Sequence, residues 1–120
     1  MQRALPGILI GGVLGSALRW AAIELGDAAD YEPAKVLIGV NALGCFVLGL
    51  VVARWPDAND PRRLAVGLGF AGGLTTFSAL AVEVAAGIHV SDYSPLAASV
   101  PVQLLAGVVF FLVGRKAAAT

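Results

Sequence analysis

The sequence contains little charge. Of its 120 residues, 13% are Asp, Glu, Lys or Arg, compared with roughly a quarter in an average soluble domain. Hydrophobic residues make up 58% of the chain, and the mean hydropathy is +0.85. So few charged side chains cannot cover the surface of a soluble protein, so the sequence indicates a protein whose solvent is the lipid bilayer.

Cysteine pairs, basic clusters and catalytic groupings are also missing. The single cysteine, Cys45, excludes an internal disulfide and a cysteine-based zinc site. A formal net charge of zero, without basic patches interleaved with aromatic residues, argues against binding to nucleic acid. His89 stands alone in a polar stretch, with no nucleophile and base pair or metal-ligand cluster around it. Nothing in the sequence points to an enzyme.

Four long apolar runs dominate the chain. A helix needs about 20 predominantly apolar residues to cross the hydrocarbon core of a bilayer. Such runs occupy residues 4–25, 34–55, 64–88 and 96–113, with polar loops between them. We therefore predict an all-α membrane protein with one four-helix transmembrane domain over residues 1–120. The basic, apolar N-terminus is expected to be a retained helix, because no cleavage site of small residues interrupts it.

The basic residues are distributed unequally between the two sides of this four-span topology. Four spans put both termini on one side, which then carries Arg3, Arg54, Arg62, Arg63, Arg115 and Lys116. The other side has Lys35, joined by Arg19 if that residue faces the same way. Because positive residues favour the cytoplasmic side, we expect a multi-pass protein of a bacterial-type inner membrane with both termini in the cytoplasm.

The third run contains an unusual stretch, GFAGGLTTFSAL, over residues 69–80. Together with Gly67, the glycines Gly69 and Gly72 spell the G-x-G-x-x-G pattern of dinucleotide-binding proteins. That fingerprint requires a preceding strand, whereas here a polar loop precedes a membrane-grade apolar run. The dinucleotide interpretation is therefore disfavoured.

Two other interpretations of this stretch remain. Small residues allow transmembrane helices to pack closely, and we favour this role for the glycines of the first two spans, namely Gly11, Gly15, Gly39, Gly44 and Gly49. In the third span, Thr75, Thr76 and Ser78 follow directly after the glycines, and packing does not account for them. Adjacent glycines weaken a helix by about 1 kcal/mol each relative to alanine. An interrupted backbone at membrane depth is tolerated where it is buried in protein or lines a polar path, so we favour a third helix broken near its middle.

Two further polar residues lie inside predicted spans. Asn41 is costly in hydrocarbon unless it faces a hydrogen-bond partner or a water-filled path. Both an interhelical hydrogen bond and a place on a polar transport path remain open. Arg19 is costlier still, and we expect it to reach the interface or an aqueous vestibule.

Three stretches of the chain together resemble the CrcB/Fluc fluoride channel family: GGVLGSALRW (11–20), Asn41-x-x-Gly44-x-Phe46, and GFAGGLTTFSALAVEV (69–84). The resemblance implies a dimer of two four-helix subunits inserted in opposite orientations. Two narrow pores at the interface would export cytoplasmic fluoride passively and so reduce its toxicity, and a structural sodium ion would sit at the dimer centre.

The resemblance also assigns roles to particular residues. It implies that backbone carbonyls of Gly72 and Thr75 hold the sodium ion. The fluoride pathway would be formed by Asn41, Phe77, Ser78, Thr76, Glu83 near the pore mouth, and Arg19 of the first helix. A phenyl ring has a positive edge and an amide donates N–H groups, so Phe77 and Asn41 would both be uncharged donors. Weak donors suit conduction, because an anion must leave as readily as it enters.

The chain departs from the family pattern in three ways. Leu80 stands where a second phenylalanine is usual, one helical turn after Phe77. Ser99 and Gln103 are the nearest equivalents of a tyrosine and a serine on the fourth helix. The strong charge bias does not suit a chain that inserts both ways. We therefore expect pairing with a paralogous subunit in preference to a homodimer; which pore conducts, and with what selectivity, stays open.

The best alternative is a small four-helix multidrug or cation transporter, which shares the length and the antiparallel dimer. Such a transporter needs a carboxylate at mid-membrane in its first helix, and the first acidic residue here is Glu24, at the far end of that run. A purely structural membrane subunit is a third option, which would leave Asn41 and the polar break unexplained.

Overall fold

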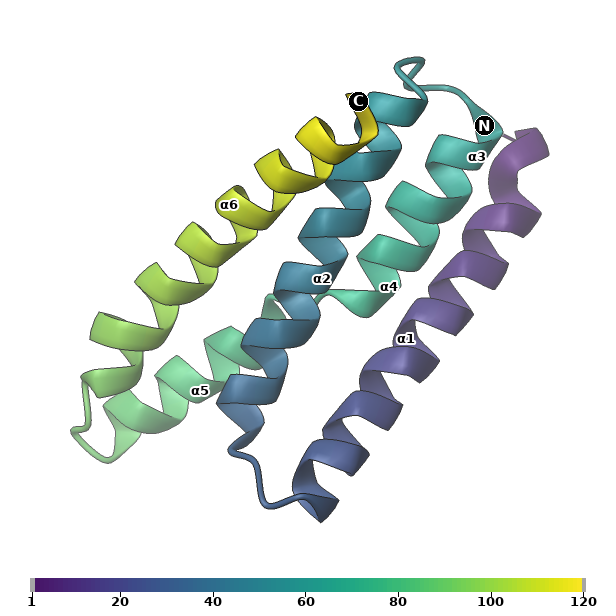
Figure 1. Cartoon of the computed structure of the whole chain (residues 1–120). Helices are drawn as coiled ribbons and strands as arrows, with labels where there is room; N and C mark the ends of the chain where they lie inside the picture. Colours follow the sequence, from purple (N-terminus) through teal and green to yellow (C-terminus); the bar gives the residue numbers. More distant parts are fainter. Residues whose placement is uncertain (1, 120) are drawn as a thin grey trace.

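The computed structural model describes residues 2–119 and confirms the four-helix prediction. Four helical segments are long and apolar enough to cross a membrane: Gln2–Ala28, Pro33–Arg54, Pro61–His89 and Leu96–Ala119. No strand occurs among these described residues. Figure 1 shows that the chain begins and ends at the same end of the bundle, and the last helix extends beyond the predicted residue 113 to Ala119.

Each of the first two segments is formed mainly by one long helix, whereas the third and fourth combine several helical pieces. A short 3₁₀ turn, η1 (Gln2–Ala4), leads into α1 (Leu5–Ala28), and α2 (Pro33–Arg54) follows. The third segment joins α3 (Pro61–Arg63), the π-helical stretch η2 (Leu64–Ala71), α4 (Gly72–Leu74) and α5 (Ser78–His89). The fourth joins a second π-helical stretch, η3 (Pro95–Ser99), to α6 (Val100–Ala119).

Glycines let the helices approach along two seams, α1 against η2 and α4, and α2 against α6. A Cβ atom added to Gly11 or Gly15 would collide with a backbone carbonyl of η2, and one added to Gly49 would collide with the Phe111 carbonyl. The packing prediction is confirmed at these glycines. At Gly39 it is wrong, because no atom lies within 4 Å of such a Cβ.

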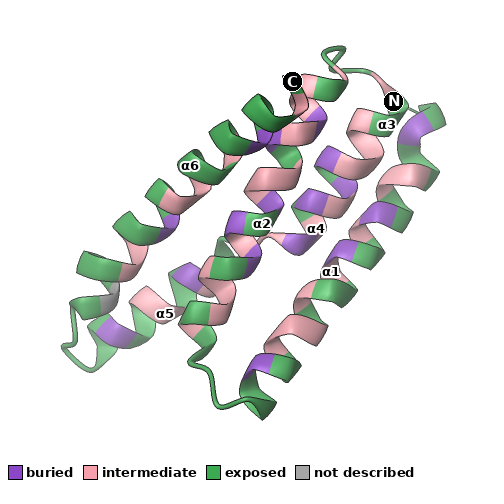
Figure 2. Cartoon of the chain, viewed as in Figure 1, coloured by how far each residue is buried: buried purple, intermediate pink, exposed green. Residues whose placement is uncertain are grey.

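Few side chains are fully enclosed by the chain itself. The buried apolar residues are mostly small or lie on the seams: Ala4, Val40, Ala42, Val51, Ala71, Leu74 and Leu80. Many large hydrophobic side chains point outward instead, and Figure 2 shows exposed positions along the outer sides of all the long helices. These outer faces suit contact with lipid or with another protein in the membrane.

The third helix is broken as predicted, but the interruption comes after the glycines. Gly72 and Gly73 are helical, and the helix stops at Thr75, whose backbone is extended (φ −82°, ψ 154°). Gly73 serves packing, since an added Cβ would lie 2.5 Å from the Gly12 carbonyl oxygen. The segment before Gly67 is helical, so the dinucleotide fingerprint is excluded. Beyond the break, α5 turns away from α1 and runs toward η3 (Figure 1).

Candidate functional site: a polar helix break beside a membrane groove

The side chain of Asn41 on α2 completes the broken backbone. Its Oδ1 accepts a hydrogen bond from the Thr76 N–H at 2.9 Å, and its Nδ2 donates to the Thr76 carbonyl at 3.2 Å. Backbone groups at membrane depth have no water to bond with and are costly when unpaired. Asn41 therefore replaces the helical partners that Thr76 lacks. The predicted interhelical hydrogen bond is confirmed, and the role of Asn41 in a fluoride pathway stays a prediction.

Helix α1 supplies two more partners for the break. The Arg19 guanidinium donates to the Thr75 carbonyl at 3.1 Å, and the Ser16 hydroxyl donates to the Gly73 carbonyl at 3.4 Å. In an unbroken helix the Thr76 N–H would bond to the carbonyl of Gly72. Because that N–H turns to Asn41, the Gly72 carbonyl loses its helical donor.

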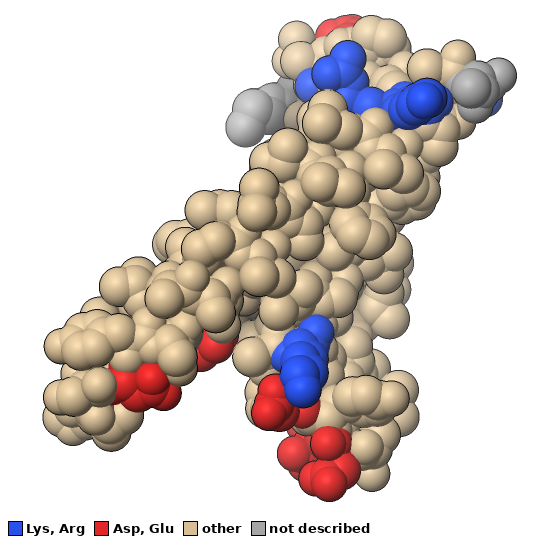
Figure 3. All heavy atoms as spheres, turned by 60° about the vertical axis from the view of Figure 1, so that its left-hand side comes forward, with Lys and Arg blue, Asp and Glu red and all other residues tan. Residues whose placement is uncertain are grey.

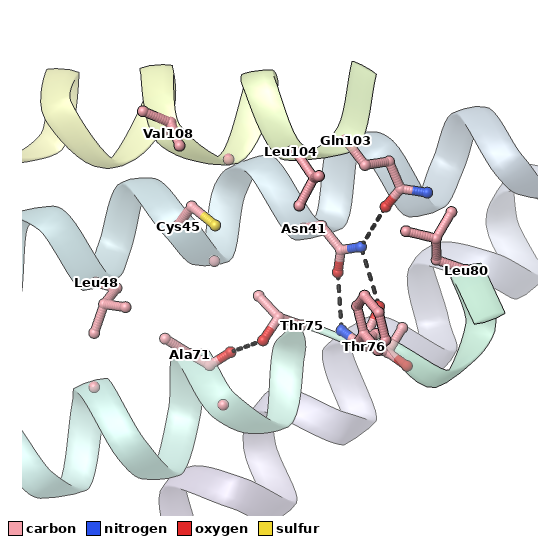
Figure 4. Close-up of a pocket in the computed structure, with 15 residues that line it drawn as sticks. Asn41, Cys45, Leu48, Ala71, Thr75, Thr76, Leu80, Gln103, Leu104 and Val108 are labelled. Carbon is pink, nitrogen blue, oxygen red and sulfur yellow. Dashed lines mark hydrogen bonds between the residues drawn. The ribbon is translucent and has the colours of Figure 1, made fainter. Parts of the chain in front are cut away.

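A groove of 420 Å³ opens between α2, the break and α6. Its polar lining comes from Asn41, Thr75, Thr76 and Gln103, and Phe77 and Leu80 line it as well. Most of the remainder consists of apolar residues of α2 and α6, among them Cys45, Leu48, Leu104 and Val108, and η2 and α4 contribute as well (Figure 4). Most of the lining is apolar, and its polar groups carry no formal charge.

A second depression, also 420 Å³, lies on the other side of the break between α1, α2 and α5. Arg19, Thr76 and Ser78 contribute its polar groups. The hydroxyls of Thr76 and Ser78 lie 3.0 Å apart, and the Ala79 N–H points to Thr76 Oγ1 at 3.4 Å at the start of α5. Thr76 lines both hollows, so the break separates them.

Gln103 on α6 is the residue that the sequence analysis undervalued. Its side chain is 8% exposed, and its Oε1 accepts from Asn41 Nδ2 at 2.7 Å. Its Nε2 is buried and has no hydrogen-bond partner among the described residues. A glutamine inside an apolar span is itself costly, and that cost is the signal that could have singled it out.

The predicted site residues fall into three groups. Asn41, Gly72, Thr75, Thr76 and Phe77 meet at the groove. Arg19 and Ser78 lie in the second depression together with Thr76. Glu83 is apart from both: one of its carboxylate oxygens accepts from the Ser99 hydroxyl at 2.7 Å, and the other is buried without a partner among the described residues.

The phenyl ring of Phe77 is unusual in its exposure. The residue is 75% exposed although it lies at a helix break in the middle of the bundle. Leu80, one turn later, is 4% exposed and packs into the groove. The two positions therefore differ in environment: Phe77 faces outward from this chain, whereas Leu80 belongs to its interior.

A comparison with known protein families identifies the chain. The family model described as CrcB-like protein, Camphor Resistance (CrcB), matches residues 7–115. The chain belongs to this family. The resemblance noted from the three sequence stretches is thereby confirmed, and the match includes the helix break and both hollows beside it.

Curated relatives in the CrcB family are named as channels. Fluoride-specific ion channel FluC 1 of Yersinia pseudotuberculosis is 40% identical over 88 residues, which cover 70% of this chain and 68% of the relative. Fluoride-specific ion channel FluC of Acinetobacter baumannii is 29% identical over 117 residues, covering 95% and 92%. FluC 2 of Corynebacterium jeikeium is 36% identical over 95 residues, covering 64% and 56%. These names agree with the expectation that the chain is not an enzyme.

Proposed function

We propose that this protein is a subunit of a fluoride-specific channel that lets fluoride leave the cytoplasm passively and so limits its toxicity. One observation supports this most strongly. In a chain of the CrcB family, whose relatives are named fluoride-specific ion channels, the helix break presents uncharged donors beside an open groove. Fluoride that enters a cell as hydrogen fluoride ionises in the more alkaline cytoplasm, so a passive exit is sufficient.

The composition of the groove suits a small anion that has lost its water. Amide N–H groups, hydroxyls and the positive edge of a phenyl ring all attract fluoride without a formal charge. A charged lining would bind the ion too tightly for rapid release. The proposed pathway uses Asn41, Thr76, Phe77 and Ser78, with Arg19 in the second depression and Glu83 toward one mouth.

We propose that two subunits in opposite orientations form the conducting unit. Phe77 is 75% exposed on the isolated chain, and the groove beside it is open on one side. A second subunit packed over this face would bury the ring and turn the open groove into an enclosed pore. Two such pores would then lie along the interface.

A sodium ion at the centre of the dimer is part of the proposal. The carbonyl of Gly72 lacks its helical donor, and Gly72 lines the open groove. The carbonyl of Thr75 has one acceptor position in use by Arg19 and keeps a second lone pair. The same carbonyls from two subunits would give four oxygen ligands for the ion.

We further propose that the partner is a paralogous subunit and that this chain has its termini in the cytoplasm. The basic residues gather at the end that holds the termini, and acidic residues predominate at the other end (Figure 3). A chain so biased has one preferred orientation. The numbered names FluC 1 and FluC 2 among the relatives support the idea of paired subunits.

Fluoride efflux from liposomes tests the function directly. We expect liposomes that contain this chain and its paralogue to release fluoride rapidly and chloride slowly. Robust efflux from this chain alone would contradict the pairing. Absence of fluoride efflux with both chains present, or proton-coupled uptake of a cationic drug, would contradict the channel and favour a transporter.

A further inference from the structure

The hydrogen bonds around Asn41 determine which way each side-chain amide points. The Thr76 N–H can only donate, so the atom of Asn41 that faces it must be the oxygen (2.9 Å). The NH₂ group of Asn41 then faces the Thr76 carbonyl and Gln103. Gln103 must therefore present its oxygen to Asn41 (2.7 Å), and its own NH₂ group points away from Asn41, on the side where Leu80 lies (Figure 4).

This chain of bonds uses all the donor capacity of Asn41. An amide NH₂ group has two hydrogens. One is donated to the Thr76 carbonyl at 3.2 Å and the other to Gln103 Oε1 at 2.7 Å. An anion in the groove can receive a hydrogen bond from Asn41 only if one of these two bonds breaks.

The NH₂ group of Gln103 is in the opposite situation. Gln103 belongs to the lining of the groove, and its Nε2 is buried within the chain without a partner among the described residues. Burial of an unpaired donor is costly, and an anion beside it would remove that cost. No acidic side chain is among the described residues that line this groove, and Glu83 accepts a hydrogen bond from Ser99 outside it.

We propose that Gln103 Nε2 is the amide donor that contacts the permeating anion, and that Asn41 is a positioning residue. Asn41 binds the Thr76 backbone through its Oδ1 and one hydrogen of its NH₂ group. The other hydrogen of that group fixes the orientation of Gln103. This inference rests on the proposed fluoride channel and names the donor within it. An amide N–H is a stronger donor than a phenyl C–H, and it remains uncharged, as rapid release requires.

The sequence offers a direct way to observe the donor. The chain has only two glutamines, Gln2 and Gln103, and two asparagines, Asn41 and Asn59. Labelling the side-chain amides of this chain alone with ¹⁵N, in the full complex with its unlabelled paralogue, gives four resolvable groups for nuclear magnetic resonance. Sodium fluoride is titrated at constant ionic strength against sodium chloride, and fluoride efflux is measured on the same preparation.

We expect fluoride to shift the Gln103 side-chain signal in a saturable way, while the signals of Gln2 and Asn59 stay unchanged as internal controls. A shift of Asn41 without one of Gln103 would overturn the assignment in favour of Asn41. If neither signal moves while the complex releases fluoride, this inference fails and the channel stands. If neither moves and no fluoride is released, both fail.

Two substitutions separate contact with the anion from a structural role. Gln103→Glu keeps an oxygen that accepts from Asn41 but removes the free NH₂ group and adds a negative charge, whereas Gln103→Met removes both amide groups without adding a charge. Contact with the anion predicts that both variants weaken the apparent fluoride affinity, on the order of tenfold to a hundredfold for loss of a hydrogen bond to a charged group. A Gln103→Glu variant with unchanged affinity and efflux would overturn the proposal and leave Gln103 as a support for Asn41.

Discussion

At the scale of single residues, each polar group inside the membrane needs a hydrogen-bond partner within the protein. Asn41 pairs with both the N–H and the carbonyl of Thr76, and Arg19 pairs with the carbonyl of Thr75. These side chains on α1 and α2 allow the third helix to stop at mid-bundle without leaving all of its backbone groups unpaired. Residues that suggest transport from sequence alone are thus also structural supports.

Replacing Asn41 should therefore destabilise the fold. Asn41→Leu leaves the N–H and carbonyl of Thr76 without partners, at about 1–3 kcal/mol for each group. We expect a clear fall in the midpoint of thermal unfolding, measured by tryptophan fluorescence in detergent. Asn59→Ala, in the loop after α2, is the matched control and should change stability by less than about 0.5 kcal/mol. Equal midpoints for the two variants would contradict the supporting role.

Phe77 offers the opposite case, a residue whose loss should affect transport more than folding of the chain. The ring is 75% exposed, so Phe77→Ile removes little buried surface. We expect fluoride efflux through the pore that Phe77 lines to be abolished, while the unfolding midpoint changes little. Phe110→Ile, an exposed position on α6 outside both hollows, serves as control. Unchanged efflux in Phe77→Ile would remove this ring from the pathway.

At the scale of helices, glycine positions decide how closely the elements approach and where backbone meets backbone. Gly11 and Gly15 bring α1 against η2 and α4, and Gly49 brings α2 against α6. The break itself occurs at Thr75 to Phe77, beyond the helical glycines. Partners on α1 and α2, together with the extended backbone of Thr75, place the interruption there.

A matched pair of glycine substitutions tests this division of roles. A Cβ at Gly15 collides with the Phe70 carbonyl, so Gly15→Ala should cost about 1–3 kcal/mol through overpacking. At Gly39 the space is open, and Gly39→Ala should stabilise α2 by up to about 1 kcal/mol through helix propensity alone. Thermal unfolding of the two variants decides the matter, and a destabilised Gly39→Ala would show that its surroundings are tighter.

The start of the third segment should depend on pH. Asp60 Oδ1 accepts from the Arg62 N–H at 2.8 Å, and hydrogen bonds from Arg62 lower the pKa of Asp60 below its ordinary 3.8. Because the pKa is lowered in the folded state, this cap contributes stability above pH 3.8 and loses it as the pH falls through the lowered value. Hydrogen exchange at the start of α3 should rise in that acidic range. In Asp60→Asn that dependence should disappear; if it persists, another group is responsible.

At the scale of the whole molecule, the distribution of charge and the exposed apolar faces suit the proposed pairing with a second subunit. Basic residues lie near the termini, and large hydrophobic side chains cover the outer faces of the bundle. Phe77 lies among these outward-facing groups. In the proposed channel, a complete pore would be a property of the assembly, and this chain would supply one wall of it.

Orientation in the membrane can be measured with reporters. A phosphatase that is active only outside the cytoplasm, fused after residue 120, should be inactive, because the positive end stays inside. Replacing Arg62, Arg63, Arg115 and Lys116 by glutamine should yield a mixed population with partial activity. An active fusion of the unmodified chain would contradict the proposed orientation, and a variant that stays fully inactive would show that these charges do not set it.

The sequence by itself determined the solvent, the number of helices and the existence of a break. Four apolar runs are long enough only for membrane spans, and the stretch over residues 69–80 interrupts its helix within those residues. It also drew attention to Asn41 and Arg19, because a polar side chain in hydrocarbon requires a partner whatever that partner is.

Only the tertiary structure decided which residues are the hydrogen-bond partners of Asn41 and Arg19. The Asn41 bonds to Thr76 and Gln103 join residues 35 and 62 positions apart, and no local pattern encodes such contacts. Tertiary contacts also show that Gly69 and Gly73 of the third helix pack against α1, that Gly39 has no packing role in this chain, and that the unpaired amide belongs to Gln103. Hydrophobicity and helix propensity act locally and can be read along the chain, whereas hydrogen-bond partners across helices exist only once the helices have packed.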